Sequence, residues 1–370
     1  METLYIEPAK LKQSLQRNEA FWNNQLEDYP LLWITVPNAR PGKTIPEPAT
    51  EDELWTDVDY VIEAAENQLA CTHFGGDALP THNPWLGPDQ FSAWLGAEMK
   101  LMPRDFTSWV KPFVNDWREF PDFKIDMNNR WWKLYLEILR RSAEYGKDKW
   151  ITCYPDLHTG IDALGAIRGQ ENLMIDMISN PEPILRAMEQ MTQLWKDIVD
   201  ITSDIIMPAG QGTSNWTGGW SEKRFLCIGQ FDFTCMISPQ MFKDFCYRDF
   251  KETCDYVDVS LLHLDGPGCA RHIDKMLETE SLDSVQWIQG AGNPTPIHWL
   301  DLLKKIEQAG KSIQLFYEPT HGGDADIFNE LDVLCTHLNP KRLFFYIITD
   351  SVEKSDAIVK HAQKLCFGSK

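Results

Sequence analysis

The chain is poor in basic residues. It has 35 Lys and Arg against 55 Asp and Glu in 370 residues, a formal net charge of −20. Phosphate backbones and anionic membrane surfaces repel such a protein, so we expect no nucleic-acid or membrane partner. No apolar run approaches the length of a membrane span. The N-terminal METLYIEPAKLKQ lacks the basic start and apolar core of a secretory signal. These absences favour a cytoplasmic protein.

Cysteine pairs and a dinucleotide-binding motif are also absent. The nine cysteines are odd in number and include no CxxC, which fits a reducing compartment better than a disulfide scaffold. Cys227, Cys235, Cys246 and Cys254 lie mostly at helical spacing, where a buried thiol is the default. No GxGxxG follows the first apolar run, which disfavours a dinucleotide fold.

Tryptophan is abundant, with 15 residues in the chain. Trp216 and Trp220 lie in QGTSNWTGGW, among glycine and polar residues rather than aliphatic ones. Such residues line cavity walls, where the flat ring binds an apolar or sugar-like group, or they pack within a loop. Both interpretations stay open from the sequence.

The rest of the chain alternates short apolar runs with helical stretches. Stretches with helical spacing cover 180–201, 238–257 and 296–310, and Ser238 followed by Pro239 is a typical helix start. Apolar runs occur at 30–37, 149–155, 203–210, 259–266, 284–292, 312–319 and 342–350. Strands buried on both faces between helices are typical of a parallel sheet.

Seven or eight such units predict an α/β fold, a closed (β/α)8 TIM barrel. We expect residues 1–148 to hold the first barrel strand and a helical, Trp-rich extension that covers one mouth. Residues 149–370 would form the main part of the barrel, in a single domain overall.

A barrel places its site at the carboxyl ends of the strands. His263 and Asp265 in LLHLDGPG are two apart on a predicted strand and so share a face. They suit a metal pair or an acid/base pair, or a hydrogen bond that only closes the barrel mouth. Asp156 and His158 in YPDLHTG form a second pair, although a carboxylate there can simply cap a helix. The polar residues at these ends are Asp156, His158, Ser214, Asn215, Asp232, His263, Asp265, Gln286, Glu318 and Asp350.

The two pairs together could bind a divalent metal ion, with Glu318 as a further ligand or base. Asp265 and Glu318 are also candidate paired carboxylates. Two carboxyl groups across a Trp-lined pocket are what glycoside cleavage requires. A carbohydrate-active hydrolase or lyase is therefore the alternative function.

The run from FDFTCMISPQMFKDF through HLDGPG and VQWIQGAG to LFYEP resembles the uroporphyrinogen decarboxylase-like superfamily, which includes corrinoid-dependent and cobalamin-independent methyltransferases. The resemblance covers roughly residues 150–370. It implies a (β/α)8 barrel, a site at its carboxyl mouth, a corrinoid carried by a partner protein, and a homodimer.

The chain departs from both well-understood branches of that superfamily. Zinc methyltransferases of this superfamily carry His-x-Cys on one strand, often an acidic residue on the next, and a Cys after the last strand. The positions that resemble these here are His263, Asp265, Gln286 and Thr349-Asp350-Ser351. Without thiolates, an oxygen-rich metal site or none is expected rather than zinc activation of a thiol. The decarboxylases hold their substrate with an N-terminal Arg-rich segment, and only Arg17 and Arg40 lie near this N-terminus. Porphyrinogen decarboxylation is not expected.

The sequence therefore predicts a methyltransferase-like barrel enzyme that acts on a small organic substrate. His263 and Asp265 would bind a metal or act as the acid/base pair, and Glu318 and Asp156 would be further catalytic residues that orient the substrate. The expected substrate-binding residues are Asn215, Trp216, Trp220, His158, Asp232 and Gln286.

Overall fold

The computed structural model describes residues 5–119, 122–318 and 326–367. Its main sheet has seven strands in the order β2-β1-β11-β10-β9-β8-β7. In this order, each strand after β1 is parallel to its neighbour, whereas β2 at the edge is antiparallel to β1. The strands of this sheet are β1 Leu31–Val36, β2 His73–Gly76, β7 Phe225–Gly229, β8 Val259–Asp265, β9 Ser284–Ile288, β10 Ser312–Tyr317 and β11 Leu343–Ile348.

Two smaller strand pairs lie outside this sheet. β3 Thr81–His82 pairs in parallel with β6 Ile151–Thr152, and β4 Glu98–Met102 pairs with β5 Thr107–Lys111 in an antiparallel hairpin. Beyond β6, the amide of Tyr154 donates to the carbonyl of Ser214 at 2.9 Å. The segment after β6 is thus joined to the segment before β7.

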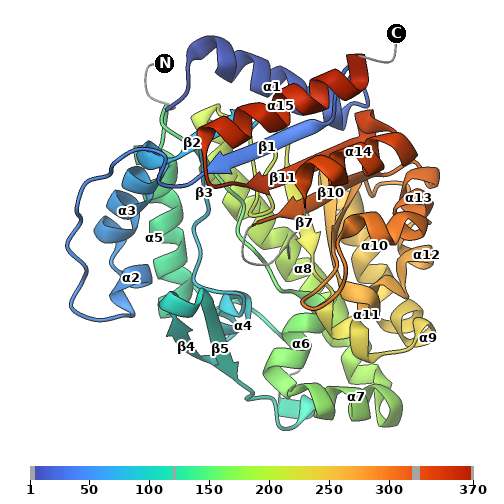
Figure 1. Cartoon of the computed structure of the whole chain (residues 1–370). Coiled ribbons are helices and arrows are strands. Elements are labelled where there is room, and N and C mark those ends of the chain that lie inside the picture. Colours follow the sequence, from blue (N-terminus) through green and yellow to red (C-terminus); the bar gives the residue numbers. More distant parts are fainter. Residues whose placement is uncertain (1–4, 120–121, 319–325, 368–370) are drawn as a thin grey trace.

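Helices cover the outside of the sheet (Figure 1), with α15 packed on β1 and β2, α13 on β10 and α10 on β7. The α-helices are α1 Pro8–Trp22, α2 Glu53–Thr56, α3 Val58–Cys71, α4 Gln90–Trp94, α5 Arg130–Tyr145, α6 Gly160–Arg168, α7 Gln170–Ser179, α8 Pro181–Ile206, α9 Pro239–Met241, α10 Tyr247–Tyr256, α11 Gly266–Ala270, α12 Ile273–Met276, α13 Leu300–Gln308, α14 Ile327–His337 and α15 Val352–Phe367. Short 3-10 turns include η4 Asp232–Met236 and η6 Pro296–Trp299, and a π-helical turn, η5 Phe242–Cys246, links α9 to α10.

The predicted alternation of buried strands and helices is confirmed from β8 to α15. The strands are fully or almost fully buried because helices cover one face and the interior of the fold covers the other. The capped start at Ser238 is also confirmed, since its hydroxyl accepts a hydrogen bond from the amide of Met241 at 3.2 Å.

Two details of the sequence prediction are wrong. The run 203–210 is not a strand, because α8 continues to Ile206 and a 3-10 turn follows. Ile206 of this run continues the buried stripe of α8 that includes Val199. Cys227 lies on β7, a buried apolar run of five residues, and not at helical spacing.

The region 38–148 contains α2 to α5 as expected, but also the β4–β5 hairpin and strands β2 and β3. The hairpin lies at the lower end of the molecule in Figure 1, near α6 and α7. The division into an extension and a main barrel at residue 148 stays a prediction.

The parallel architecture is present, and closure into an eight-stranded barrel stays a prediction. In the part of the chain that the structure describes, no helix is both long enough and apolar enough to cross a bilayer. All nine cysteines are unpaired thiols.

Candidate functional site

His263 and Gln286 meet at the carboxyl ends of β8 and β9. The two residues are direct neighbours in the register of these strands. Nδ1 of His263 donates to Oε1 of Gln286 at 2.5 Å, so the other ring nitrogen, Nε2, is left to accept a proton or, in the imidazolium form, to donate one. The Trp216 ring lies 5.0 Å from the His263 ring, centroid to centroid. The predicted neighbours His263, Gln286 and Trp216 are therefore brought together.

Asp265 ends β8 on the same face as His263. Burial raises the pKa of its carboxyl group; the nearby His263 opposes this shift and Asp232 adds to it. Asp265 thus interacts electrostatically with its predicted partner His263 on the same strand, and with Asp232 after β7.

Asp156 and His158 lie in the loop between β6 and α6. Nε2 of His158 is 3.4 Å from Oδ2 of Asp156, while Oδ1 of Asp156 accepts a hydrogen bond from the side-chain amide of Gln230. Burial opposes the charge on His158, but attraction to Asp156, and then to Asp162 and Asp232, raises its pKa to about 9. His158 is a cation at neutral pH, and its pair with Asp156 is an ion pair rather than a helix cap.

Two further carboxyl groups, those of Asp162 and Asp232, lie near His158. Oδ1 of Asp162 accepts from the amide of Phe233 at 2.8 Å. Burial and repulsion by Asp232 raise the pKa of Asp162 to about 7, against the attraction of His158. Phe231, just before Asp232, has a left-handed backbone with φ of 56°, a strained conformation that sets the direction of the η4 turn.

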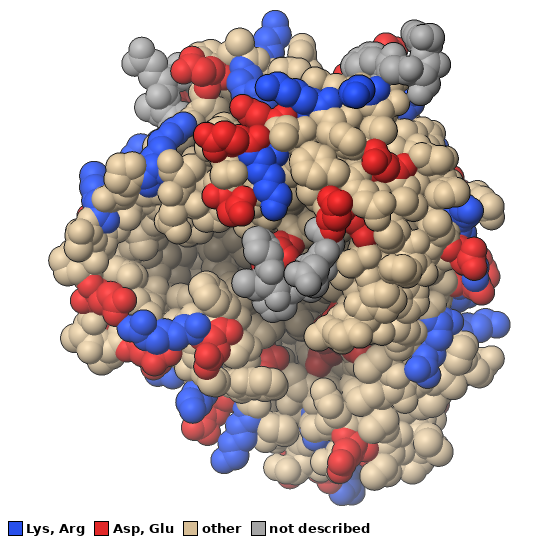
Figure 2. All heavy atoms as spheres, viewed as in Figure 1, with Lys and Arg blue, Asp and Glu red and all other residues tan. Residues whose placement is uncertain are grey.

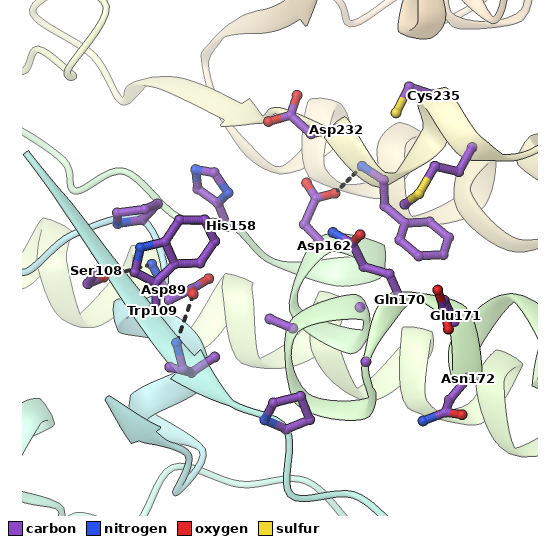
Figure 3. Close-up of a pocket in the computed structure, with 18 of the residues that line it drawn as sticks. Asp89, Ser108, Trp109, His158, Asp162, Gln170, Glu171, Asn172, Asp232 and Cys235 are labelled. Carbon is purple, nitrogen blue, oxygen red and sulfur yellow. Dashed lines mark hydrogen bonds between the residues drawn. The ribbon is translucent and has the colours of Figure 1, made fainter. Parts of the chain in front are cut away.

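His158, Asp162 and Asp232 line a cavity of about 900 Å³ between the β4–β5 hairpin and α6, α7 and η4. Figure 3 shows Asp89, Ser108, Trp109 and His158 on one side and Asp162, Gln170, Glu171 and Asn172 on the other. The face viewed in Figure 2 is hollowed near its centre. The charge of Asp232 acts on Asp162 and His158 in the lining and also on Asp265, which lies outside the lining.

Asn215 lies in a buried polar turn beside Trp216. Its Oδ1 accepts from the amide and hydroxyl of Thr217, at 2.9 and 2.6 Å. Its Nδ2 is buried with no hydrogen-bond partner among the described residues, as is Oε1 of Gln230. Unsatisfied buried groups are costly, so these atoms are candidates for contact with a ligand or water.

Trp220 lies in a different packing cluster from Trp216, with Phe21, Trp33 and Phe344 among its members. Its indole nitrogen donates to the carbonyl of Gln211 at 2.7 Å. These contacts account for its burial, and its part in a substrate wall stays a prediction.

Glu318 and Asp350 follow β10 and β11 as predicted, and Asp350 is exposed. The charge of Glu318 adds to burial and to Cys153 in raising the pKa of Tyr346 to about 12, which places Glu318 near that ring. One strand, β9, separates β10 from β8, so these two strands lie roughly 10 Å apart, and Glu318 lies beyond the end of β10.

A metal ion fits His263 and Asp265 only with donors from elsewhere. Catalytic zinc sites in proteins use three protein ligands. Among residues 5–119, 122–318 and 326–367, no group of three or more His, Cys, Asp or Glu side chains is arranged to hold a metal ion. The described donors alone therefore do not form such a site, and metal binding by this pair stays a prediction.

Sequence reasoning missed Asp89, Trp109, Asp162 and Gln230. Asp162 lies in the first turn of the helix after YPDLHTG, and Gln230 lies two residues before Asp232, so both were close to motifs already considered. Asp89 and Trp109 come from the hairpin region, and their approach to His158 depends on tertiary packing that no local pattern encodes.

Comparison with known proteins shows the fold alone. No family model matches the chain, and no curated protein matches it in sequence. A solved methyltransferase from Methanosarcina mazei is similar in structure, with a TM-score of 0.60 and 13% identity over 95% of this chain and 98% of that one. The chain therefore shares the fold of a methyltransferase over nearly its whole length.

Proposed function

We propose that this protein is a methyltransferase-like enzyme of the uroporphyrinogen decarboxylase-like superfamily, built on a closed barrel, that acts on a small organic substrate. The observation that carries the proposal is the His263–Gln286 hydrogen bond beside Trp216 and Asp265. It fixes the imidazole and leaves one ring nitrogen for proton transfer. The shared fold with a methyltransferase supports the reaction class.

His263 and Asp265 act as the acid/base pair in this proposal. As the bond between the methyl carbon and a substrate heteroatom breaks, its electron pair stays on the heteroatom and the carbon bonds to the acceptor. A leaving group that would otherwise depart as an anion takes a proton from the pair, whereas an amine that leaves from a quaternary ammonium group departs neutral. Positioned proton transfer of this kind contributes on the order of 10²–10⁴-fold to a rate. The Trp216 ring provides a flat apolar surface for the substrate, and Gln286 keeps the imidazole in one orientation. The corrinoid partner implied by the resemblance remains a prediction, and no step depends on it here.

The test is methyl transfer to free cob(I)alamin, followed by the absorbance of methylcobalamin. Donors would include methylated amines, methyl thioethers and methoxylated aromatic compounds. The proposal expects transfer from at least one class of donor. If no donor is used and aryl glycosides are cleaved in a reaction that Asp265→Asn abolishes, the hydrolase alternative is correct instead.

Metal analysis separates the two roles of His263. Mass spectrometry of the purified protein and of His263→Ala would measure bound divalent metal. A stoichiometric metal lost in the variant assigns the pair to metal binding, whereas equal metal content in both proteins supports the acid/base role.

A further inference from the structure

The polar lining of the 900 Å³ cavity is acidic. Its carboxylate residues are Asp89, Asp162, Glu171 and Asp232. The described residues that line it include no Lys or Arg, and His158 is the one cation among them. A phosphate or carboxylate ligand would be repelled here, because the fixed charge has the same sign.

The charge of His158 is already matched by Asp156, which lies outside the lining and 3.4 Å from the imidazole. The carboxylates of the lining therefore keep an excess of negative charge that faces the cavity. A positively charged ligand would reduce this excess of negative charge in the cavity.

The carboxylates of the lining differ in their partners. Oδ2 of Asp89 accepts from the amide of Val110 at 3.1 Å, and Asp162 accepts from Phe233. Both therefore hold protein segments in place. In contrast, Oδ1 of Asp232 is buried and accepts no hydrogen bond from the described residues. Oδ1 itself is closed to solvent, but the Asp232 side chain as a whole is partly exposed and lines the cavity. A cationic group in the cavity would therefore be attracted to this carboxylate.

Trp109 is unusual for its exposure. It lies on β5 in the cavity lining, yet 63% of its surface is exposed. Figure 3 shows its ring across the cavity from Asp162 and Gln170. An indole face attracts cations more strongly than any other side-chain ring, and quaternary ammonium groups are bound in this way.

We infer that the cavity binds the amine or quaternary ammonium group of a small substrate, between the Trp109 ring and the Asp232 carboxylate. This inference rests on the proposed function and names the substrate class of a cavity beside the His263 group, with Asp232 as the lining residue whose charge acts on Asp265. The volume suits a small molecule, since ligand pockets commonly measure about 300–1,000 Å³.

The test is calorimetric titration with two probes of the same shape. Choline carries a trimethylammonium group, and 3,3-dimethylbutan-1-ol replaces its charged nitrogen by carbon. We expect saturable choline binding and at least about tenfold weaker binding of the neutral alcohol. Asp232→Asn and Trp109→Leu should each weaken choline binding about fivefold or more. Phe106→Leu, at the exposed turn of the same hairpin and outside the lining, should leave it unchanged.

Equal affinity for the two probes, no saturable binding of choline, or unchanged affinity in both cavity variants would overturn the inference. Trp109 is exposed, so its variant keeps the fold even if Asp232→Asn does not. Binding is measured without turnover. Choline binding without methyl transfer would thus contradict the proposed function alone, and methyl transfer without choline binding would contradict this inference alone.

Discussion

His158 is the residue whose charge the fold controls most clearly. Its pKa is raised from 6.5 to about 9, chiefly because Asp156 outweighs the effect of burial. Because the pKa of His158 is higher in the folded state than in the unfolded state, its protonation stabilises the folded state. This contribution is fully present at pH values below the unfolded-state pKa of 6.5. That contribution is lost as the pH rises from about 6.5 to about 9. Asp162, whose pKa is raised to about 7, loses its own contribution between about pH 4 and pH 7, so the loss above pH 7 comes chiefly from His158.

Wild-type protein should therefore lose stability between pH 7 and pH 9 more steeply than His158→Gln. The difference is expected to be on the order of 1–3 kcal/mol, from urea unfolding at several pH values. His337→Gln, at an exposed histidine on α14, is the matched control and should follow the wild type. Parallel stability curves for wild type and His158→Gln would refute the ion-pair assignment.

At the scale of elements, α1 is fastened to the sheet by a buried ion pair. Nε of Arg17 donates to Oδ1 of Asp77 at 2.8 Å, and Oδ2 of Asp77 accepts from the amide of Leu32 on β1 at 2.9 Å. Arg17 also pairs with Asp28 and donates to the carbonyls of Tyr29 and Pro30. Arg17, one of the arginines near the N-terminus, thus has a structural role.

Asp77→Ala should lower the free energy of unfolding by about 3 kcal/mol. It leaves a buried guanidinium without its main partner and the Leu32 amide without an acceptor. Asp116→Ala removes the exposed pair with Arg118 and should change stability by less than about 0.5 kcal/mol. Denaturant titration of both variants makes the comparison, and equal losses would contradict this account of how α1 is held.

The same scale explains what sequence could predict. Strands such as β9 and β11 are short apolar runs between helices. Because these runs are visible in the local sequence, the sequence predicts both strands correctly. His263 and Gln286 were each predicted from a strand end, but their hydrogen bond depends on the register of β8 against β9. Trp109 and Asp89 reach the cavity only because the hairpin packs beside α6, a contact that the local sequence does not encode. The strand prediction for 203–210 is wrong because a buried helical stripe resembles a strand over a few residues.

The whole molecule carries a net charge of −20, and like charges on a compact protein repel one another. Salt screens this repulsion, with a Debye length of about 10 Å at 0.1 M. The melting temperature should therefore rise between low-salt buffer and about 0.3 M NaCl, measured by scanning calorimetry. KCl serves as the control for a specific sodium effect. A fall in the melting temperature would show that the surface ion pairs outweigh the net repulsion.

The most direct test of the whole account is the rate of methyl transfer to cob(I)alamin by His263→Ala. His298→Ala, an exposed histidine at η6, is the matched control. If His263 supplies the proton at the carboxyl ends of the strands, its loss should lower the rate about 100-fold or more, with an unchanged circular dichroism spectrum and full activity in the control. A folded His263→Ala protein that transfers methyl groups at the wild-type rate would contradict the assignment of the site.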